Sequence, residues 1–251
     1  MKYQIDTIPV WEALEFQGDC MLCTLHAKTE ADEINRALGA SVMEPDVRVR
    51  TNQHGVCRRH QQMLFAAPNR LGHALLMDTH AAEVLHKLEK IKKKAQNGKE
   101  PAVRPFSARG SDNATAFALR ELAAHCVVCE TVQTHMNRYL YTMLYLWKTE
   151  TKFQKQFAGS KGVCIPHAAD LIEASAEHLN AKQRKEFIDV CLNMLTVQLS
   201  EDEKDLNWFT QKFDYKNQHK PCGNSKNAIE RTVNRLRGYC LGDVPFAKPK
   251  K

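Results

Sequence analysis

Two kinds of short metal-ligand motif occur twice in this chain, in the same order. A C-x-x-C pair is followed by a C-x-x-H pair preceded by glycine, and the second copy follows the first by 106 residues for C-x-x-C and 107 for C-x-x-H. Two ligands separated by two residues can reach one ion from a tight turn that enters a helix. The repeated spacing therefore predicts two metal centres made from Cys20, Cys23, Cys57, His60, Cys126, Cys129, Cys164 and His167.

We expect each copy to enclose its own ion. Cys20 and Cys23 would then join Cys57 and His60, and the four ligands of the second copy would join one another. The gap between half-motifs is 33 residues in the first copy and 34 in the second, enough for a helix out and a loop back. An exchanged arrangement is the alternative, in which Cys20 and Cys23 meet the second C-x-x-H pair. It requires closer packing between the copies.

Three thiolates and one imidazole suit Zn²⁺, and closed sets of four protein ligands are usually structural. The sequence therefore predicts two zinc ions, with a 4Fe-4S cluster at each position as the alternative. A zinc hydrolase would need one ligand replaced by water and is disfavoured. A thioredoxin-like C-x-x-C is excluded because no βαβ pattern surrounds it. A c-type haem is excluded because Thr24 and Glu130, not histidine, follow the C-x-x-C pairs.

Helical periodicity dominates the chain, which predicts an all-α fold built from a tandem duplication of a metal-bound helical unit. A short amphipathic segment leads into each C-x-x-C pair. The boundaries expected are 1–95 for the first copy, 96–112 for an exposed linker, 113–212 for the second copy, and 213–251 for a C-terminal turn, helix and disordered tail. Long helices are expected at 24–38, 69–94, 130–157 and 181–212, and residues 43–50 alternate in a way that favours a short extended segment.

Composition favours a cytoplasmic protein. The 251 residues carry a formal charge of +7, and the chain opens without the basic and apolar regions of a signal peptide. Nine cysteines are then better explained as metal thiolates or buried thiols than as disulfides. The longest apolar stretch, 139–147, is shorter than the roughly 18 residues that a membrane span needs.

The remaining cysteines and histidines have structural interpretations. Cys191 has apolar neighbours at helical spacing and is expected in the core, whereas Cys222 and Cys240 are expected to be free thiols. His26 is expected at the surface or behind the ligands. The histidines at 73, 80 and 86 are expected to be partly buried rather than metal ligands, and the basic run 90–94 is expected to be solvated.

The C-terminal segment contains the densest group of aromatic residues, 208–215. After it comes a turn, then an amphipathic helix with Ile229, Val233 and Leu236 on one face. This helix is expected to dock on the repeated core. An alternative is that Asp214, Tyr215, Asn217 and Asn224 line a pocket.

These motifs together resemble a family of bacterial proteins known only as a domain of unknown function. The resemblance lies in the paired C-x-x-C and G-x-C-x-x-H motifs and in the segments 8–10, 43–48, 69–72, 213–215 and 223–226, and it runs nearly from end to end. It implies no activity. Cys222 stands where the family is expected to have tryptophan, which favours a packing position over a ligand.

The sequence contains no recognisable nucleophile, paired acid or phosphate-binding loop, so an enzyme is disfavoured. Our main hypothesis is a non-enzymatic, zinc-bound helical protein that acts as an interaction or scaffold module. Its macromolecular partner would be a protein rather than a nucleic acid or a membrane. The alternative hypothesis is an iron-sulfur protein with a redox or cluster-handling role.

Overall fold

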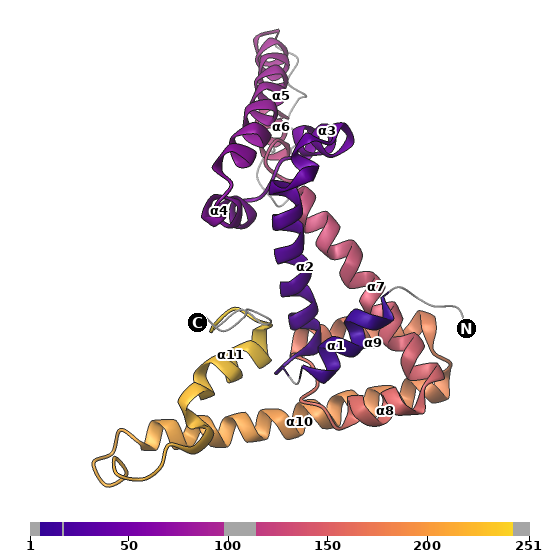
Figure 1. The fold of residues 1–251 in the computed structure, drawn as a ribbon, viewed down its shortest axis with the longest axis vertical. Helices are drawn as coiled ribbons and strands as arrows, with labels where there is room; N and C mark the ends of the chain where they lie inside the picture. Colours follow the sequence, from indigo (N-terminus) through magenta and orange to yellow (C-terminus); the bar gives the residue numbers. More distant parts are fainter. Residues whose placement is uncertain (1–5, 17, 98–113, 243–251) are drawn as a thin grey trace, which may run out of the picture. The chain divides into compact units, whose positions relative to one another are not determined.

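The computed structural model describes residues 6–16, 18–97 and 114–242. Across these ranges the chain forms α-helices and two short 3-10 helices and no strand, which confirms the all-α prediction. The elements in chain order are α1 Thr7–Glu15, α2 Met21–Leu38, η1 Ala40–Met43, α3 Pro45–His54, α4 Arg58–Ala66, α5 Arg70–Gln96, α6 Ala114–Glu121, α7 Val127–Thr149, α8 Thr151–Ala158, α9 Ile165–His178, α10 Ala181–Gln211, η2 Gly223–Asn227 and α11 Ala228–Arg237 (Figure 1).

The chain divides into two compact units. The larger unit combines residues 1–29 with 134–251, and the smaller unit is residues 30–133. The boundaries fall inside α2 and α7, so each of these helices contributes residues to both units. The units thus do not follow the order of the two motif copies along the chain. The boundaries expected at 95, 113 and 212 mark the two motif copies in the sequence, not the two compact units. The tandem duplication itself stays a prediction.

The core of the larger unit is aromatic. Phe153 and Phe157 of α8 stack with a centroid separation of 5.9 Å, and Phe157 stacks on Phe187 of α10 at 6.1 Å. Trp147 at the end of α7 meets Phe187 edge to face. All three phenylalanine rings are fully buried. Rings of this size bury large apolar areas, so this cluster holds α7, α8 and α10 together.

A break after α7 makes this cluster possible. The sequence predicted one helix over 130–157, but Glu150 adopts an extended conformation between α7 and α8. The carbonyl of Trp147, which loses its helical partner at the break, accepts a hydrogen bond from the Gln154 amide at 2.6 Å. The turn allows Phe153 and Phe157 to pack back beside Trp147. No proline or glycine marks the position, so helical periodicity alone did not reveal it.

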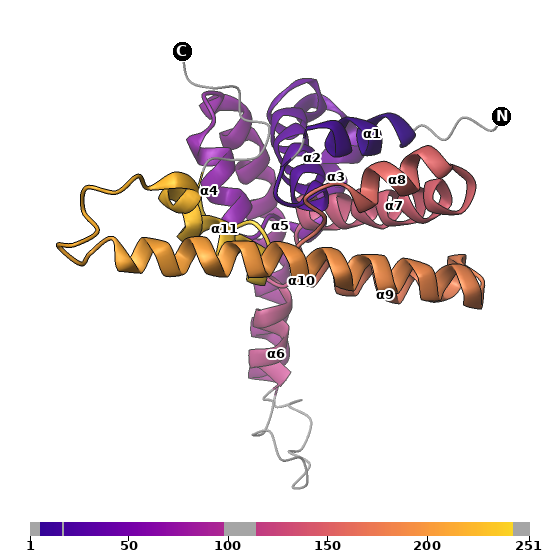
Figure 2. The same ribbon diagram turned by 90° about the horizontal axis from the view of Figure 1, so that it is seen from below.

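Around α10 the larger unit adds α9 and α11. Figure 2 shows α10 with α11 lying along one part of it, and α9 contacts both helices. The α10 N-terminus is a capping box, in which Asn180 accepts from the backbone of Gln183 and Gln183 accepts from the backbone of Asn180. Cys191 of α10 is completely buried, as expected.

The C-terminal helix α11 docks on α9 and α10, as expected, but its buried residues lie beside the apolar stripe. Ile229 and Leu236 are 43% and 40% exposed, whereas Ala228 and Arg235 are buried. The guanidinium of Arg235 donates to Asp202 at 3.0 Å, so a buried ion pair takes the place of an apolar contact. Helical periodicity located the apolar stripe correctly. It did not reveal that the neighbouring face, which contains Arg235, packs against α10.

The smaller unit contains η1, α3, α4, α5 and α6 with the adjoining parts of α2 and α7. Helices α3 and α5 pack side by side (Figure 1). The extended segment expected at 43–50 is wrong, because this stretch is the end of η1 and the start of α3. Pro45 opens α3, where a missing N–H costs nothing. Arg48 then donates to the carbonyls of Val42 and Leu75.

Two sequence expectations fall on residues outside the description. Most of the linker expected at 96–112 and all of the tail expected at 244–251 lie there. Within the described ranges, no helix combines the length and the apolar character needed to cross a membrane.

Candidate metal centres

The first ligand cluster lies in the larger unit and contains Cys20, Cys23, Cys164 and His167. The Nδ1 atom of His167 faces all three sulfurs, at 3.2 Å from Cys164, 3.4 Å from Cys20 and 3.5 Å from Cys23. The sulfurs of Cys23 and Cys164 are 3.7 Å apart. The three cysteines are buried, so this centre, the Cys20 centre, is closed to solvent on most sides.

The second cluster lies in the smaller unit and contains Cys57, His60, Cys126 and Cys129. Its geometry repeats the first: Nδ1 of His60 is 3.2 Å from Cys57, 3.3 Å from Cys126 and 3.4 Å from Cys129. The sulfurs of Cys57 and Cys129 are 3.7 Å apart. Cys129 is exposed here, so solvent reaches this centre, the Cys57 centre, more easily.

The expected pairing within each copy is therefore wrong, and the exchanged arrangement is the one found. The structure gathers all eight predicted residues, but each cluster takes its C-x-x-C pair from one copy and its C-x-x-H pair from the other. The reason lies in the path of the chain: Cys20 and Cys23 belong to the larger unit, whereas the chain after α2 builds η1, α3 and α4 in the smaller unit. Cys57 and His60 consequently lie in the same unit as the start of α7, beside Cys126 and Cys129.

All four half-motifs use the same local device at a helix N-terminus. Cys57 and Cys164 are the N-cap residues of α4 and α9, and Cys20 and Cys126 directly precede α2 and α7. The second ligand of each pair is then the third residue of its helix. The backbone N–H groups of Cys23 and Cys129 donate to Cys20 and Cys126 at 3.3 and 3.5 Å. Free N–H groups and the helix dipole both favour thiolates at these positions.

The glycine before each C-x-x-H pair has a conformational reason. Gly55 and Gly162 have φ values of +72° and +76°, in the left-handed region that favours glycine. At Gly55 a side chain would also meet the ring of His80, 2.7 Å from a Cβ atom. This ring is held by a hydrogen bond between its Nδ1 and the carbonyl of Asn52 at 2.9 Å. His80 is thus a packing residue, as expected.

A buried carboxylate lies behind the histidine of the Cys57 centre. Glu30 of α2 is 5% exposed, and its Oε1 accepts from Nε2 of His60 at 2.9 Å. Its Oε2 accepts from Arg59 at 2.6 Å. Such a carboxylate fixes the imidazole so that Nδ1 points at the thiolates. Glu30 was not predicted from the sequence, although it follows Cys23 by seven residues and so lies on the same face of α2.

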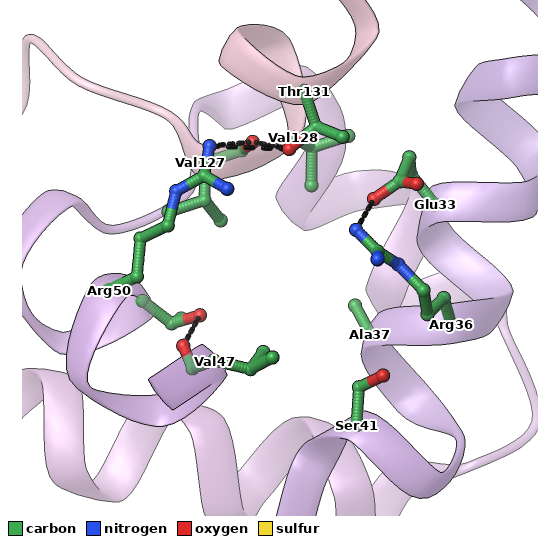
Figure 3. Close-up of a pocket in the computed structure, with 10 residues that line it drawn as sticks. Glu33, Arg36, Ala37, Ser41, Val47, Arg50, Val127, Val128 and Thr131 are labelled. Atoms are coloured by element: carbon green, nitrogen blue, oxygen red, sulfur yellow. Dashed lines mark hydrogen bonds and ion pairs between the residues drawn. The ribbon is translucent and has the colours of Figure 1, made fainter. Parts of the chain in front are cut away.

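Backbone contacts hold the two half-motifs of the Cys57 centre together. The N–H of Val127 donates to the carbonyl of Gly55 at 3.1 Å. Arg50 of α3 reaches the start of α7, where it donates to the carbonyl of Val127 and the hydroxyl of Thr131 (Figure 3). Arg50, Val127 and Thr131 border a small cavity between α2, α3 and α7. The Cys57 centre is thus supported within its own unit.

The Cys20 centre is supported by α11 instead. Arg235 donates to the carbonyls of Asp19 and Lys161, at 2.9 and 2.8 Å, so one buried guanidinium joins the residues that lead into both half-motifs. Beyond α11, the N–H of Tyr239 donates to the sulfur of Cys23 at 3.2 Å. The C-terminal segment therefore has a positioning role that its sequence did not reveal.

In the Cys20 centre, the pKa of each of Cys20, Cys23 and His167 depends on its contacts with the other ligands. Burial raises the pKa of the Cys20 thiol, but hydrogen bonds with Cys164, Cys23 and His167 outweigh burial and hold it well below its usual value. Hydrogen bonds with Cys164 and Cys20 raise the pKa of Cys23 far above its usual value. Burial disfavours the cation of His167, yet hydrogen bonds with Cys164 and Cys20 raise its pKa to about 10.

The Cys57 centre shows the same pattern. Burial opposes ionisation of Cys126, but the hydrogen bond with His60 lowers its pKa to about 6. Burial and the neighbouring Cys126 thiolate raise the pKa of Cys129 to about 12. Burial disfavours the cation of His60, but hydrogen bonds with Cys126 and Glu30 raise its pKa to about 10. The closely spaced thiol and imidazole groups of each centre thus share protons. The thiolates among them would strongly attract a metal cation.

The donor sets fit a tetrahedral ion. Metal bonds of about 2.3 Å to sulfur and about 2.0 Å to nitrogen separate two thiolates by about 3.8 Å and a thiolate and an imidazole by about 3.5 Å. The sulfurs of Cys23 and Cys164 in one centre, and of Cys57 and Cys129 in the other, are 3.7 Å apart and match this value. The sulfur–nitrogen distances of 3.2 to 3.5 Å match as well. Both clusters could therefore hold a metal ion without rearrangement of the backbone.

Comparison with known proteins assigns the family but no activity. No curated protein matches the chain. No solved structure matches it either. A sequence-family model matches residues 1–243, and its description is a family of unknown function, DUF6062. This agrees with the resemblance carried by the paired motifs and the C-terminal segments. The chain belongs to the DUF6062 family.

Proposed function

We propose that the protein binds two zinc ions, one in each Cys₃His centre, and acts as a non-enzymatic interaction or scaffold module. The observation that carries this proposal is the closed set of four protein ligands in each centre, which leaves no position for a substrate. Closed zinc sites of this composition are structural and contribute folding free energy. Each ion would join two segments that are far apart in the chain.

The ligand spacing favours a single ion over an iron-sulfur cluster. In both centres the four ligand atoms lie within 4.8 Å of one another. A 4Fe-4S cluster places a different iron behind each ligand, so its ligand atoms are separated by the width of the cluster. The second candidate, an iron-sulfur protein with a redox or cluster-handling role, would require the four half-motifs to move apart.

The proposed partner is a protein in preference to a nucleic acid, with no membrane involved. Support comes from the loop after α10, where Phe213 and Tyr215 are 75% and 72% exposed. The ammonium group of Lys212 donates to the carbonyls of Asn217, Gln218 and Lys220, which orders this loop. Exposed aromatic side chains on an ordered loop are typical of protein interfaces. Thiolate-rich centres without disulfides favour the cytoplasm as the proposed location.

The test is elemental analysis of untagged protein purified without oxygen. We expect two zinc ions per chain and a colourless protein. Replacement of zinc by Co²⁺ should produce intense near-ultraviolet absorption from thiolate ligation. Iron with inorganic sulfide and a brown colour would instead support the iron-sulfur candidate. Retention of both ions in a Cys20→Ser, Cys57→Ser double variant would refute the proposed ligand sets, and Cys240→Ser is the matched control.

A further inference from the structure

A third group of metal-ligating side chains lies in the smaller unit, outside both Cys₃His centres. It consists of His54 at the end of α3, His125 before α7, and Glu130 in the first turn of α7. Nδ1 of His54 is 2.9 Å from Oε1 of Glu130, and Nδ1 of His125 is 4.0 Å from the same oxygen. One ligand atom from each residue lies within 4.8 Å of the others.

The carboxylate of Glu130 is held so that one oxygen faces the two imidazoles. Arg50 donates to Oε2 of Glu130 at 3.3 Å, while Oε1 faces His54 and His125. Arg50 is itself anchored on the first turn of α7 by Val127 and Thr131 (Figure 3). Ligating carboxylates commonly have a partner of this kind on their second oxygen. Oε1 is therefore oriented before any ion binds.

The two imidazole rings meet edge to face, and Nδ1 of each lies near this oxygen. Their centroids are 5.5 Å apart and their planes are inclined by 63°. Two octahedral ligand atoms with metal bonds of about 2.1 Å are about 3.0 Å apart. The separation between His54 and Glu130 already meets this value. Nδ1 of His125 is 4.0 Å from Oε1, so it has to approach by about 1 Å to reach this octahedral spacing, and its side chain is 54% exposed.

None of the three ligands in this group is buried, whereas each cysteine centre has at least two buried ligands. The side chains of His54 and Glu130 are 38% and 36% exposed. Three protein ligands at the surface leave the other coordination positions to water. Two histidines with one carboxylate are the ligands of catalytic zinc in some hydrolases and of mononuclear ferrous sites with open positions.

We propose that His54, His125 and Glu130 form a third, open and exchangeable site for a divalent transition-metal ion. This site is independent of the two-zinc proposal, because none of its ligands belongs to a Cys₃His centre. The two imidazole nitrogens favour Zn²⁺, Co²⁺, Ni²⁺ or Fe²⁺ over Mg²⁺ and Ca²⁺, which prefer sites made of oxygen ligands alone. The site binds its ion more weakly than the cysteine centres, since it has fewer protein ligands and the Arg50 cation lies beside it.

The experiment titrates the untagged chain, with its tightly bound ions in place, with Co²⁺ while calorimetry and the visible spectrum are recorded. We expect one further ion per chain, with weak visible absorption and no added thiolate absorption in the near ultraviolet. His54→Ala and Glu130→Gln should each lose this ion. His86→Ala is the matched control, because His86 is an exposed histidine elsewhere in the same unit, and it should bind like the unsubstituted chain.

Elemental analysis of each variant shows whether the cysteine centres remain filled, so a folding defect is recognised separately. No further ion at a tenfold excess of Co²⁺, or a further ion unaffected by either substitution, would overturn the proposal. The same titration also separates it from the proposed function. A chain with no thiolate-bound ion, but with one Co²⁺ that His54→Ala removes, would refute the two-zinc proposal and leave this one standing.

Discussion

At the scale of single residues, the two centres differ in what lies behind their ligands. His60 has the buried carboxylate of Glu30 on its second nitrogen. The Cys20 centre has instead the N–H of Tyr239 donating to Cys23 and the guanidinium of Arg235 joining the two half-motifs. Both centres have three cysteines and one histidine. The Cys57 centre is supported by the carboxylate of Glu30, and the Cys20 centre is supported by the hydrogen-bond donors of Tyr239 and Arg235. Substitutions behind the ligands should therefore affect one centre at a time.

Replacing Glu30 should weaken the Cys57 centre alone. In Glu30→Gln the imidazole of His60 loses a charged acceptor that orients its ring and strengthens Nδ1 as a donor. We expect a loss of metal affinity of about 10- to 100-fold at this centre. Competition with a chromophoric chelator measures it, and the Cys20 centre should keep its affinity. Glu89→Gln, at an exposed position of α5, is the control. Equal loss at both centres would contradict this role.

Burial of Cys191 predicts an unreactive thiol. Burial raises its pKa to about 12, so the thiol remains protonated at pH values where an ordinary cysteine, with a pKa of about 8.5, is already ionised. In the folded protein at about pH 9, alkylation should modify the exposed Cys240 and spare Cys191. Peptide mass spectrometry identifies the sites. Denaturant should remove the protection, and equal rates for both thiols in the folded protein would refute it.

At the scale of elements, four helix N-termini meet in two pairs. The starts of α2 and α9 form the Cys20 centre, and the starts of α4 and α7 form the Cys57 centre. Each pair draws one helix from each copy of the motif. The positive ends of two helices at one cluster favour three thiolates there. The pairing of helices, rather than the motifs themselves, decides which substitutions share a centre.

Double substitutions test this pairing directly. Cys57→Ser with Cys126→Ser removes ligands from a single centre, so one ion per chain should remain. Cys20→Ser with Cys57→Ser removes one ligand from each centre, so neither ion should remain. Pairing within each copy predicts the reverse result for both variants. Elemental analysis of the purified variants decides between the two, and the double variant of Cys222→Ser with Cys240→Ser serves as the control with two ions.

At the scale of the whole molecule, each centre lies entirely within one compact unit. The Cys57 centre belongs to residues 30–133 and the Cys20 centre to the remaining chain. The larger unit also has its aromatic core, whereas the described residues of the smaller unit include fewer large buried side chains, such as Ile34, Leu38, Leu64 and Leu76. Metal should therefore contribute a larger share of the stability of the smaller unit.

Hydrogen exchange should reveal this division. Structural zinc contributes on the order of 10 kcal/mol to the folding of small metal-binding domains. Cys57→Ser should therefore accelerate exchange throughout residues 30–133, and Cys164→Ser should act on the larger unit. Cys222→Ser, outside both ligand sets, should change neither. Loss of protection over the same residues in both ligand variants would show that the units do not respond separately.

Much of this organisation could be predicted from sequence, and the missing part has physical causes. Helical periodicity found the long helices, and ligand types with fixed spacing found all eight clustered residues. The pairing was not predictable because gaps of 33 and 34 residues allow either arrangement. Glu30 and Arg235 were missed because charged residues in helices are normally solvated, and only tertiary contacts show that these two are buried.

The exchanged pairing has a consequence for synthesis on the ribosome. Cys57 and Cys129 are 72 residues apart in the chain, whereas Cys23 and Cys164 are 141 apart. Once residue 129 has emerged from the ribosome, the nascent chain already contains all four ligands of the Cys57 centre. The thiols of Cys20 and Cys23 are synthesised before those at positions 57 and 129. They must stay reduced, without their two remaining ligand partners, until His167 emerges. Of the four half-motifs, the first in chain order thus waits longest for the ligands that complete its centre.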